Sequence, residues 1–115
     1  MDIINIIFQN RVCSFERLID FGFRKKGDTY FYKTVLSSSG FEMNVSVTEQ
    51  GSVSAMVWDT DLNEPYTLHL VSGAVGEFVG KIKSEYEEVL NSISDKCFEL
   101  DVFKTDFAKE IITYV

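Results

Sequence analysis

Histidine, cysteine and proline are scarce in this sequence. One histidine, two cysteines and one proline occur among 115 residues. Because zinc sites and activated nucleophiles draw on these residue types, we expect neither a histidine pair nor a His–Cys metal cluster within one chain. His69, alone in an alternating segment, is interpreted as a structural or surface residue. Cys13 and Cys97 lie among apolar residues, which is typical of buried free thiols rather than of a disulfide framework.

Long apolar runs are also absent. The stretch from Ile3 to Phe8 lacks a basic leader and is too short for the apolar part of a signal peptide. No segment approaches the roughly 20 apolar residues of a membrane span. We therefore expect a cytoplasmic protein that does not bind a membrane. The content of 45% hydrophobic and 25% charged residues is typical of a single globular domain.

Basic residues are too few to balance the acids, and the formal net charge is −7. Residues 41–70 contain five acids and no base. Because an acidic surface repels phosphate backbones, we expect no direct contact with nucleic acid. The one basic cluster, Arg24-Lys25-Lys26 with Asp28 close by, is interpreted as solvated turn charge rather than as a phosphate-binding patch.

Apolar periodicity predicts helices towards both ends of the chain and strands between them. Two short helices are expected, over about 2–9 and from an N-cap at Ser14 to a closing Gly22, or alternatively one helix merged around Arg11. Four strands are expected over 29–36, 41–48, 52–58 and 66–71. A long helix is expected over about 74–98 and a last helix over 105–115.

These elements predict a two-layer α+β fold. It consists of a four-stranded antiparallel meander sheet with the long C-terminal helix packed on one face, preceded by short N-terminal helices. The last helix ends on apolar residues without a glycine or proline stop. We therefore expect residues 1–115 to be one domain taken from a longer chain, with the helix over 105–115 leading toward a second domain.

The turn before the third strand decides which of its side chains are buried. If residues 49–51 form a three-residue hairpin loop with Gly51 in the left-handed conformation, the odd-numbered residues of 53–57 join the dry face. A two-residue loop would bury Met56 and Trp58 instead, because a slip of one residue exchanges the two faces. We favour the first register, which leaves Met56 and Trp58 as an apolar pair on the polar face.

Three segments imitate known sites, and each departs from the required pattern. Asp59 to Asn63 is similar to the opening of a calcium loop, but Glu64 occupies the position that needs glycine. The glycines of residues 76–81 are one residue too close for a phosphate loop. The adjacent Glu87 and Glu88 point in different directions on a helix. We therefore expect no catalytic residues, no metal site, no cofactor and no enzyme activity.

Several segments over residues 15–115 are similar to those of a known protein family. They are Phe21-Gly22-Phe23, Tyr66-Thr67-Leu68-His69, Gly76-Glu77-Phe78-Val79-Gly80-Lys81 with Tyr86-Glu87, Cys97-Phe98-Glu99 and Asp101-Val102-Phe103-Lys104. In these segments the chain resembles the N-terminal domain of two-domain MmcQ/YjbR-like bacterial proteins. The resemblance implies a CyaY-like C-terminal domain beyond the last helix. The family's DNA-binding label attaches to that second domain, so no catalytic or DNA-contacting residue is carried over.

Our leading hypothesis is an interaction or accessory domain without catalytic activity. Its candidate partner surface comprises Met56 and Trp58 on the sheet and Phe107, Ile111 and Val115 on the last helix. The partner would be the C-terminal domain of the same longer chain or a second copy of this one. Alternatively, the first two helices cover Met56 and Trp58.

Two other functions remain as alternatives. One is a small-ligand-binding domain that uses an aromatic sheet surface around Trp58, with Tyr30, Tyr32 or Tyr66 as neighbours. The other is a nucleic-acid-binding accessory domain, whose affinity would fall steeply with added salt.

Overall fold

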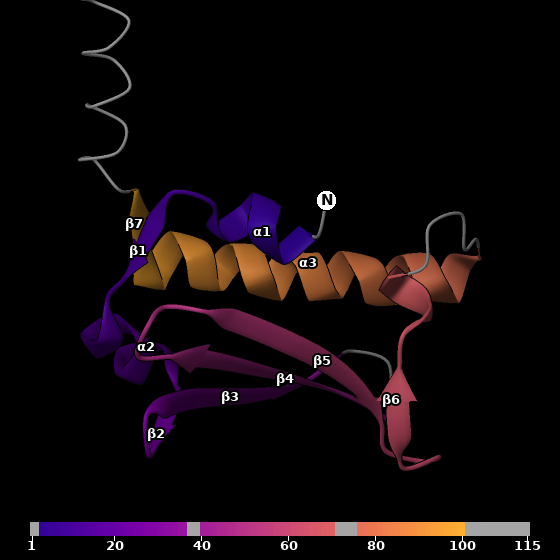
Figure 1. Cartoon of the computed structure of the whole chain (residues 1–115). Coiled ribbons are helices and arrows are strands. Elements are labelled where there is room, and N and C mark those ends of the chain that lie inside the picture. Colours follow the sequence, from indigo (N-terminus) through magenta and orange to yellow (C-terminus); the bar gives the residue numbers. More distant parts are fainter. Residues whose placement is uncertain (1–2, 37–39, 71–75, 101–115) are drawn as a thin grey trace, which may run out of the picture.

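The computed structural model describes residues 3–36, 40–70 and 76–100, which form an α+β fold (Figure 1). An antiparallel sheet of five strands forms one layer, with the strand order β2-β3-β4-β5-β6. The strands are β2 Arg24–Lys26, β3 Thr29–Val35, β4 Phe41–Thr48, β5 Val53–Asp59 and β6 Glu64–Tyr66. Each strand pairs with the next along the chain, so the sheet is a meander.

The second layer is dominated by the long helix α3, Glu77–Cys97, which runs along one face of the sheet (Figure 1). The short helices α1, Ile3–Phe8, and α2, Phe15–Phe21, both pack against α3. A separate two-stranded ribbon pairs β1, Arg11–Cys13, with β7, Phe98–Leu100. The prediction of an α+β fold with an antiparallel sheet and a long C-terminal helix is therefore confirmed.

The structure differs from the predicted four strands at the edge formed by β2. The basic cluster Arg24–Lys26 is not turn charge but a strand, joined to β3 by a turn at Gly27 and Asp28. Apolar periodicity could not predict this strand, because the cluster contains no apolar residue. An edge strand exposed to solvent needs none, and charged side chains protect it from pairing with other chains.

The opposite edge also departs from the prediction, which placed a strand over 66–71. The ladder ends at Tyr66, and Leu68–Leu70 form a short 3-10 helix, η1. Its turn is closed by the N–H of Leu70, which donates to the carbonyl of Thr67 at 2.9 Å. Pro65 lacks an N–H for further pairing, which is typical of an edge strand. The alternating apolar residues after Tyr66 therefore belong to a helical turn.

The N-terminal helices do not merge, because β1 separates them. Ser14 occupies the N-cap position of α2, although its side chain makes no capping hydrogen bond. Gly22 ends the helix with φ of +127°, and its N–H donates to the carbonyls of Leu18 and Ile19. The prediction of a helix closed by this glycine is confirmed. The last helix predicted over 105–115 lies outside the described residues.

The hairpin between β4 and β5 has the favoured register. Gly51 adopts a φ of +86°, and its N–H donates to the carbonyl of Thr48 at 2.8 Å. Val45 lies opposite Ala55, and Met43 lies opposite Val57. The odd-numbered residues of both strands therefore share the inner face, which faces α3, and Met56 lies on the other face of the sheet.

The core lies between the inner face of the sheet and α3. Fully buried side chains recur on α3 at intervals of three or four residues, as an amphipathic helix requires. They are Ile82, Tyr86, Leu90, Ile93 and Cys97. Met43, Val45, Val47 and Val57 face them from the sheet. Burial of these side chains supplies most of the stability of the fold, at roughly 1.5–3 kcal/mol for each large apolar side chain.

Candidate functional site

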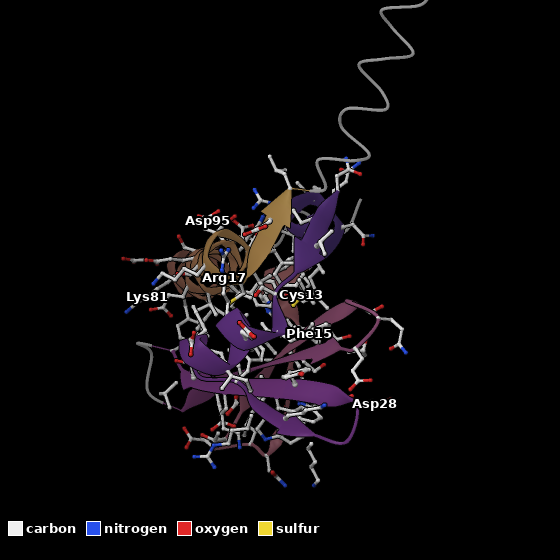
Figure 2. The ribbon with its side chains drawn as sticks, turned by 90° about the vertical axis from the view of Figure 1, so that its left-hand side faces the viewer. Cys13, Phe15, Arg17, Asp28, Lys81 and Asp95 are labelled. Carbon is white, nitrogen blue, oxygen red and sulfur yellow. The ribbon has the colours of Figure 1, made fainter. Side chains whose placement is uncertain are left out.

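The face of the sheet turned away from α3 is the candidate functional site, and we call it the outer face. None of the described helices lies on it, as the view along α3 shows (Figure 2). Strand pairing sets Arg24, Phe31 and Ser46 in one row across it. The outer face comprises Arg24, Lys26, Phe31, Lys33, Val35, Glu42, Asn44, Ser46, Ser54, Met56 and Trp58.

Large apolar side chains are half exposed on the outer face. Phe31 exposes 46% of its surface, Met56 47% and Val35 71%, and Trp58 is partly buried. The outer face also forms a hollow of about 870 Å³ lined by residues of β2 to β5, including Phe31 and Met56. Single exposed apolar residues are ordinary on protein surfaces. Several on one face, around a hollow, are typical of a surface that contacts a partner.

Positive charge lies on the β2 and β3 side of the outer face. Arg24 and Lys26 project from β2, and Lys33 lies in the row that contains Asn44 and Met56. Among the outer-face residues only Glu42 is acidic, and it pairs with Lys33 at 3.6 Å. Neither Arg24 nor Lys26 makes an ion pair with a described residue. The outer face is therefore locally cationic in a chain whose net charge is −7.

The structure brings together some of the residues that the sequence predicted for a site and separates others. Met56 and Trp58 lie on the same face of β5, and α1 and α2 do not cover them, because both helices pack against α3. Phe107, Ile111 and Val115 lie outside the described part of the chain.

The expectation that tyrosines surround Trp58 was wrong. Tyr30, Tyr32 and Tyr66 lie opposite Val47, Val45 and Val57 and therefore point to the inner face. There they contact the rings of Phe15, Phe23 and Phe41, respectively. Strand alternation excludes them from the surface that carries Trp58, because that residue lies opposite Glu42 and Pro65.

Sequence reasoning missed Phe31 and two basic residues, Arg24 and Lys26. In β3 both faces carry apolar residues, since Phe31 and Val35 alternate with Tyr30 and Tyr32. Alternation within this strand therefore did not show which row is exposed. The register between β3 and β4 would have shown that Phe31 is exposed. It places Phe31 opposite Ser46, which belongs to the clearly polar row of β4.

The outermost strands β2 and β6 are poorly suited to pairing with another strand, although residues 32–35 of β3 and 53–56 of β5 extend beyond them and pair on one side only. The edge at β2 has only three residues, and all of them are exposed and basic. The edge at β6 also has three residues, one of which is Pro65. Short strands, lysine and proline are common protections of sheet edges. The outer face therefore offers a partner its side chains rather than its backbone.

The described residues contain no group of three or more His, Cys, Asp and Glu side chains arranged to hold a metal ion. Burial, together with the neighbouring Cys97, raises the pKa of the Cys13 thiol to about 11. A thiol with such a pKa is protonated at neutral pH, and the thiolate is the nucleophilic form. Cys13 is therefore a poor nucleophile.

His69 belongs to an aromatic cluster between η1 and α3. Its ring stacks on Tyr66 with centroids 5.6 Å apart and meets the ring of Tyr86 edge-on at 4.6 Å. Only 4% of His69 is exposed, and neither ring nitrogen has a hydrogen-bond partner among the described residues. Burial lowers the pKa of His69 below its ordinary value. The residue is structural, and the expected alternating strand around it is absent.

The environment of His69 makes stability depend on pH. Between the lowered pKa of the folded state and the ordinary value of about 6.5, the unfolded chain binds a proton that the folded chain does not. Stability therefore rises with pH through this window and falls on acidification, by at most about 1.4 kcal/mol per pH unit.

We expect His69→Phe to remove this component. Urea unfolding between about pH 5.5 and 7.5 measures it for both chains. Identical pH dependence of the two unfolding free energies would contradict the assignment.

Comparisons of the chain with protein-family models, with curated proteins and with solved structures found no match. The resemblance to MmcQ/YjbR-like proteins therefore stays a prediction. None of the described helices is long and apolar enough to cross a membrane.

Proposed function

We propose that this chain is a non-catalytic binding module whose outer face takes a partner that combines apolar and anionic groups. One observation carries the proposal: half-exposed Phe31 and Met56 share a sheet face with three basic residues of β2 and β3, and no described helix covers that face. Apolar contacts would supply most of the affinity, and the cations would select against partners of like charge.

A protein-sized partner is better supported than a small ligand. The hollow has the volume of many ligand pockets, but its lining comes from the strands of one layer. Small-molecule sites typically enclose most of the ligand surface. A molecule resting on a single sheet face contacts protein on one side only. The small-ligand hypothesis therefore stays an alternative with less support.

A fluorescent probe with both required properties tests the proposal. The dye 8-anilinonaphthalene-1-sulfonate combines aromatic rings with an anionic sulfonate, and we expect it to bind the native chain. The double variant Phe31→Ser/Met56→Ser should weaken binding about tenfold, because it removes roughly 1.4 kcal/mol or more of apolar contact. Dye titration measures the affinity, and near-UV circular dichroism checks that the fold persists.

Val12→Ser serves as the matched control. Val12 exposes 55% of its surface but belongs to the ribbon formed by β1 and β7. Its replacement removes a comparably exposed apolar side chain and should leave dye affinity unchanged. Equal dye binding by the wild-type chain and the outer-face variant would overturn the proposal.

A further inference from the structure

We infer that the outer face takes an amphipathic helix whose apolar stripe is bordered by carboxylates. This inference rests on the proposed function and adds the chemical class of the partner. Three features carry it: the lack of free backbone groups on the outer face, the size and shape of that surface, and its charge.

The first feature concerns the backbone of the partner. A segment that covers the hollow loses water from its own N–H and C=O groups, and these need other hydrogen-bond partners. A segment on the outer face lies over side chains and not along an edge of the sheet, and the sheet's own N–H and C=O groups pair within its ladders, so an added extended strand would find no backbone partners there. A helix satisfies its backbone internally and needs only side chains from the sheet.

The second feature is the size and shape of the surface. Five strands spaced by about 4.8 Å make a sheet about 19 Å wide, which a helix crosses in about 13 residues. On the inner face, α3 already covers the same sheet with an apolar stripe. Antiparallel sheets commonly leave the face opposite their helices open, so the outer face has room for a helix supplied by a partner.

The third feature is charge. Arg24 and Lys26 flank Phe31 on one side of the hollow, and neither has an acidic partner among the described residues. Lys33 follows Phe31 on the same face of β3 and pairs with Glu42. Glutamate or aspartate side chains along a helix would meet these cations while its apolar stripe covers Phe31 and Met56. Basic partners would meet uncompensated like charge, which gives selectivity.

A single-stranded nucleic acid would also bring negative charge, but the surface fits it less well. Such strands are bound by cations that follow the backbone and by several aromatic rings that stack on successive bases. The outer face has two aromatic rings, half-exposed Phe31 and partly buried Trp58, which lie in different rows on β3 and β5 and do not form a continuous stacking path. The net charge of −7 also repels a polyphosphate at long range. The helix is therefore the favoured occupant.

The test uses synthetic probes with the full chain at an ionic strength of about 0.15 M. The main probe is a labelled helical peptide of about 16 residues with leucines on one stripe and glutamates beside it. A peptide with lysine in place of each glutamate, a scrambled peptide of the same composition, and an oligothymidylate of about 15 nucleotides are the comparison probes. Fluorescence anisotropy measures each affinity, and we expect the acidic amphipathic peptide to bind most tightly.

Matched charge variants locate the contact. Arg24→Glu/Lys26→Glu should weaken binding of the acidic peptide about tenfold, since each reversal replaces an attraction by a repulsion. Lys81→Glu/Lys83→Glu changes the net charge equally, but at exposed positions on α3. It should change the affinity less than about threefold, because these charges are distant and screened. Equal losses in both variants would overturn the inference.

The remaining outcomes separate the inference from the proposed function. Tighter binding of the oligothymidylate, or equal binding of the scrambled peptide, overturns the helix while leaving a binding face in place. A wild-type dimer that Phe31→Ser/Met56→Ser converts to a monomer would also overturn the helix, because a second copy of the chain would then occupy the outer face. Dye binding without peptide binding also overturns the helix alone, whereas loss of both contradicts the proposed function itself.

Discussion

Val57→Asp is expected to abolish cooperative folding, whereas Met56→Asp at the adjacent position should leave the fold intact. Val57 is fully buried on the inner face, opposite Met43 and Tyr66. A carboxylate there has no cationic partner on the facing strands, and an unpaired buried charge costs several kcal/mol. Because a domain of this size is stable by only about 5–15 kcal/mol, a loss of about 4 kcal/mol or more removes much of that margin.

Met56→Asp provides the matched comparison. Met56 is half exposed on the outer face, so its carboxylate would stay hydrated and close to Lys33. We expect its free energy of unfolding to change by less than about 1 kcal/mol. Thermal unfolding followed by circular dichroism distinguishes the two variants. If Met56→Asp unfolded the chain and Val57→Asp did not, the register of β4 and β5 would be wrong.

Leu90→Ala is expected to lower the free energy of unfolding by about 2–5 kcal/mol. Leu90 is fully buried in the stripe of α3 that faces the sheet. Its truncation loses apolar burial and leaves a cavity, because neighbours in a packed core relax only partly. Urea unfolding measures the difference from the wild-type chain.

Glu88→Ala is the control for this substitution. Glu88 is exposed on the same helix, and alanine has high helix propensity, so the unfolding free energy should change by less than about 0.5 kcal/mol. A similar loss for both variants would mean that α3 does not pack against the sheet through this stripe.

The clearest periodic patterns allowed correct predictions. In β4, apolar and polar residues alternate without exception from Phe41 to Thr48, and a half-buried strand follows directly from that pattern. In α3, apolar residues recur at helical spacing, and the buried stripe from Ile82 to Cys97 agrees with the prediction. Gly51 also pointed to the loop that sets the register, because its positive φ is easy only for glycine.

Weaker patterns led to the errors at the two sheet edges. β2 has no apolar residue, so periodicity could not reveal it, and its strand conformation depends on hydrogen bonds to β3. The segment after Tyr66 alternates like a strand but leaves the sheet, although β5 extends back to Val53 beside it. It becomes the helical turn η1, in which His69 packs against Tyr86 of α3.

The residues of the candidate site were also predicted only in part. The sequence placed Met56 and Trp58 on one face of a strand, because side chains two positions apart point the same way. It also showed an excess of acid and a single basic cluster. It did not show that Arg24, Lys26 and Phe31 share that face, since this depends on β2 forming a strand and on the registers between consecutive strands.

The sequence by itself therefore determined the α+β class, the buried rows of β4 and α3, and the scarcity of histidine and cysteine. These properties follow from local periodicity and composition. Tertiary structure alone decided that β2 adds a cationic edge, that Tyr30, Tyr32 and Tyr66 face inward, and that Phe31 joins Met56 around an open hollow. The reason is physical: which face of a strand meets solvent is settled by the pairing and packing of all its neighbours, and no single strand encodes that choice.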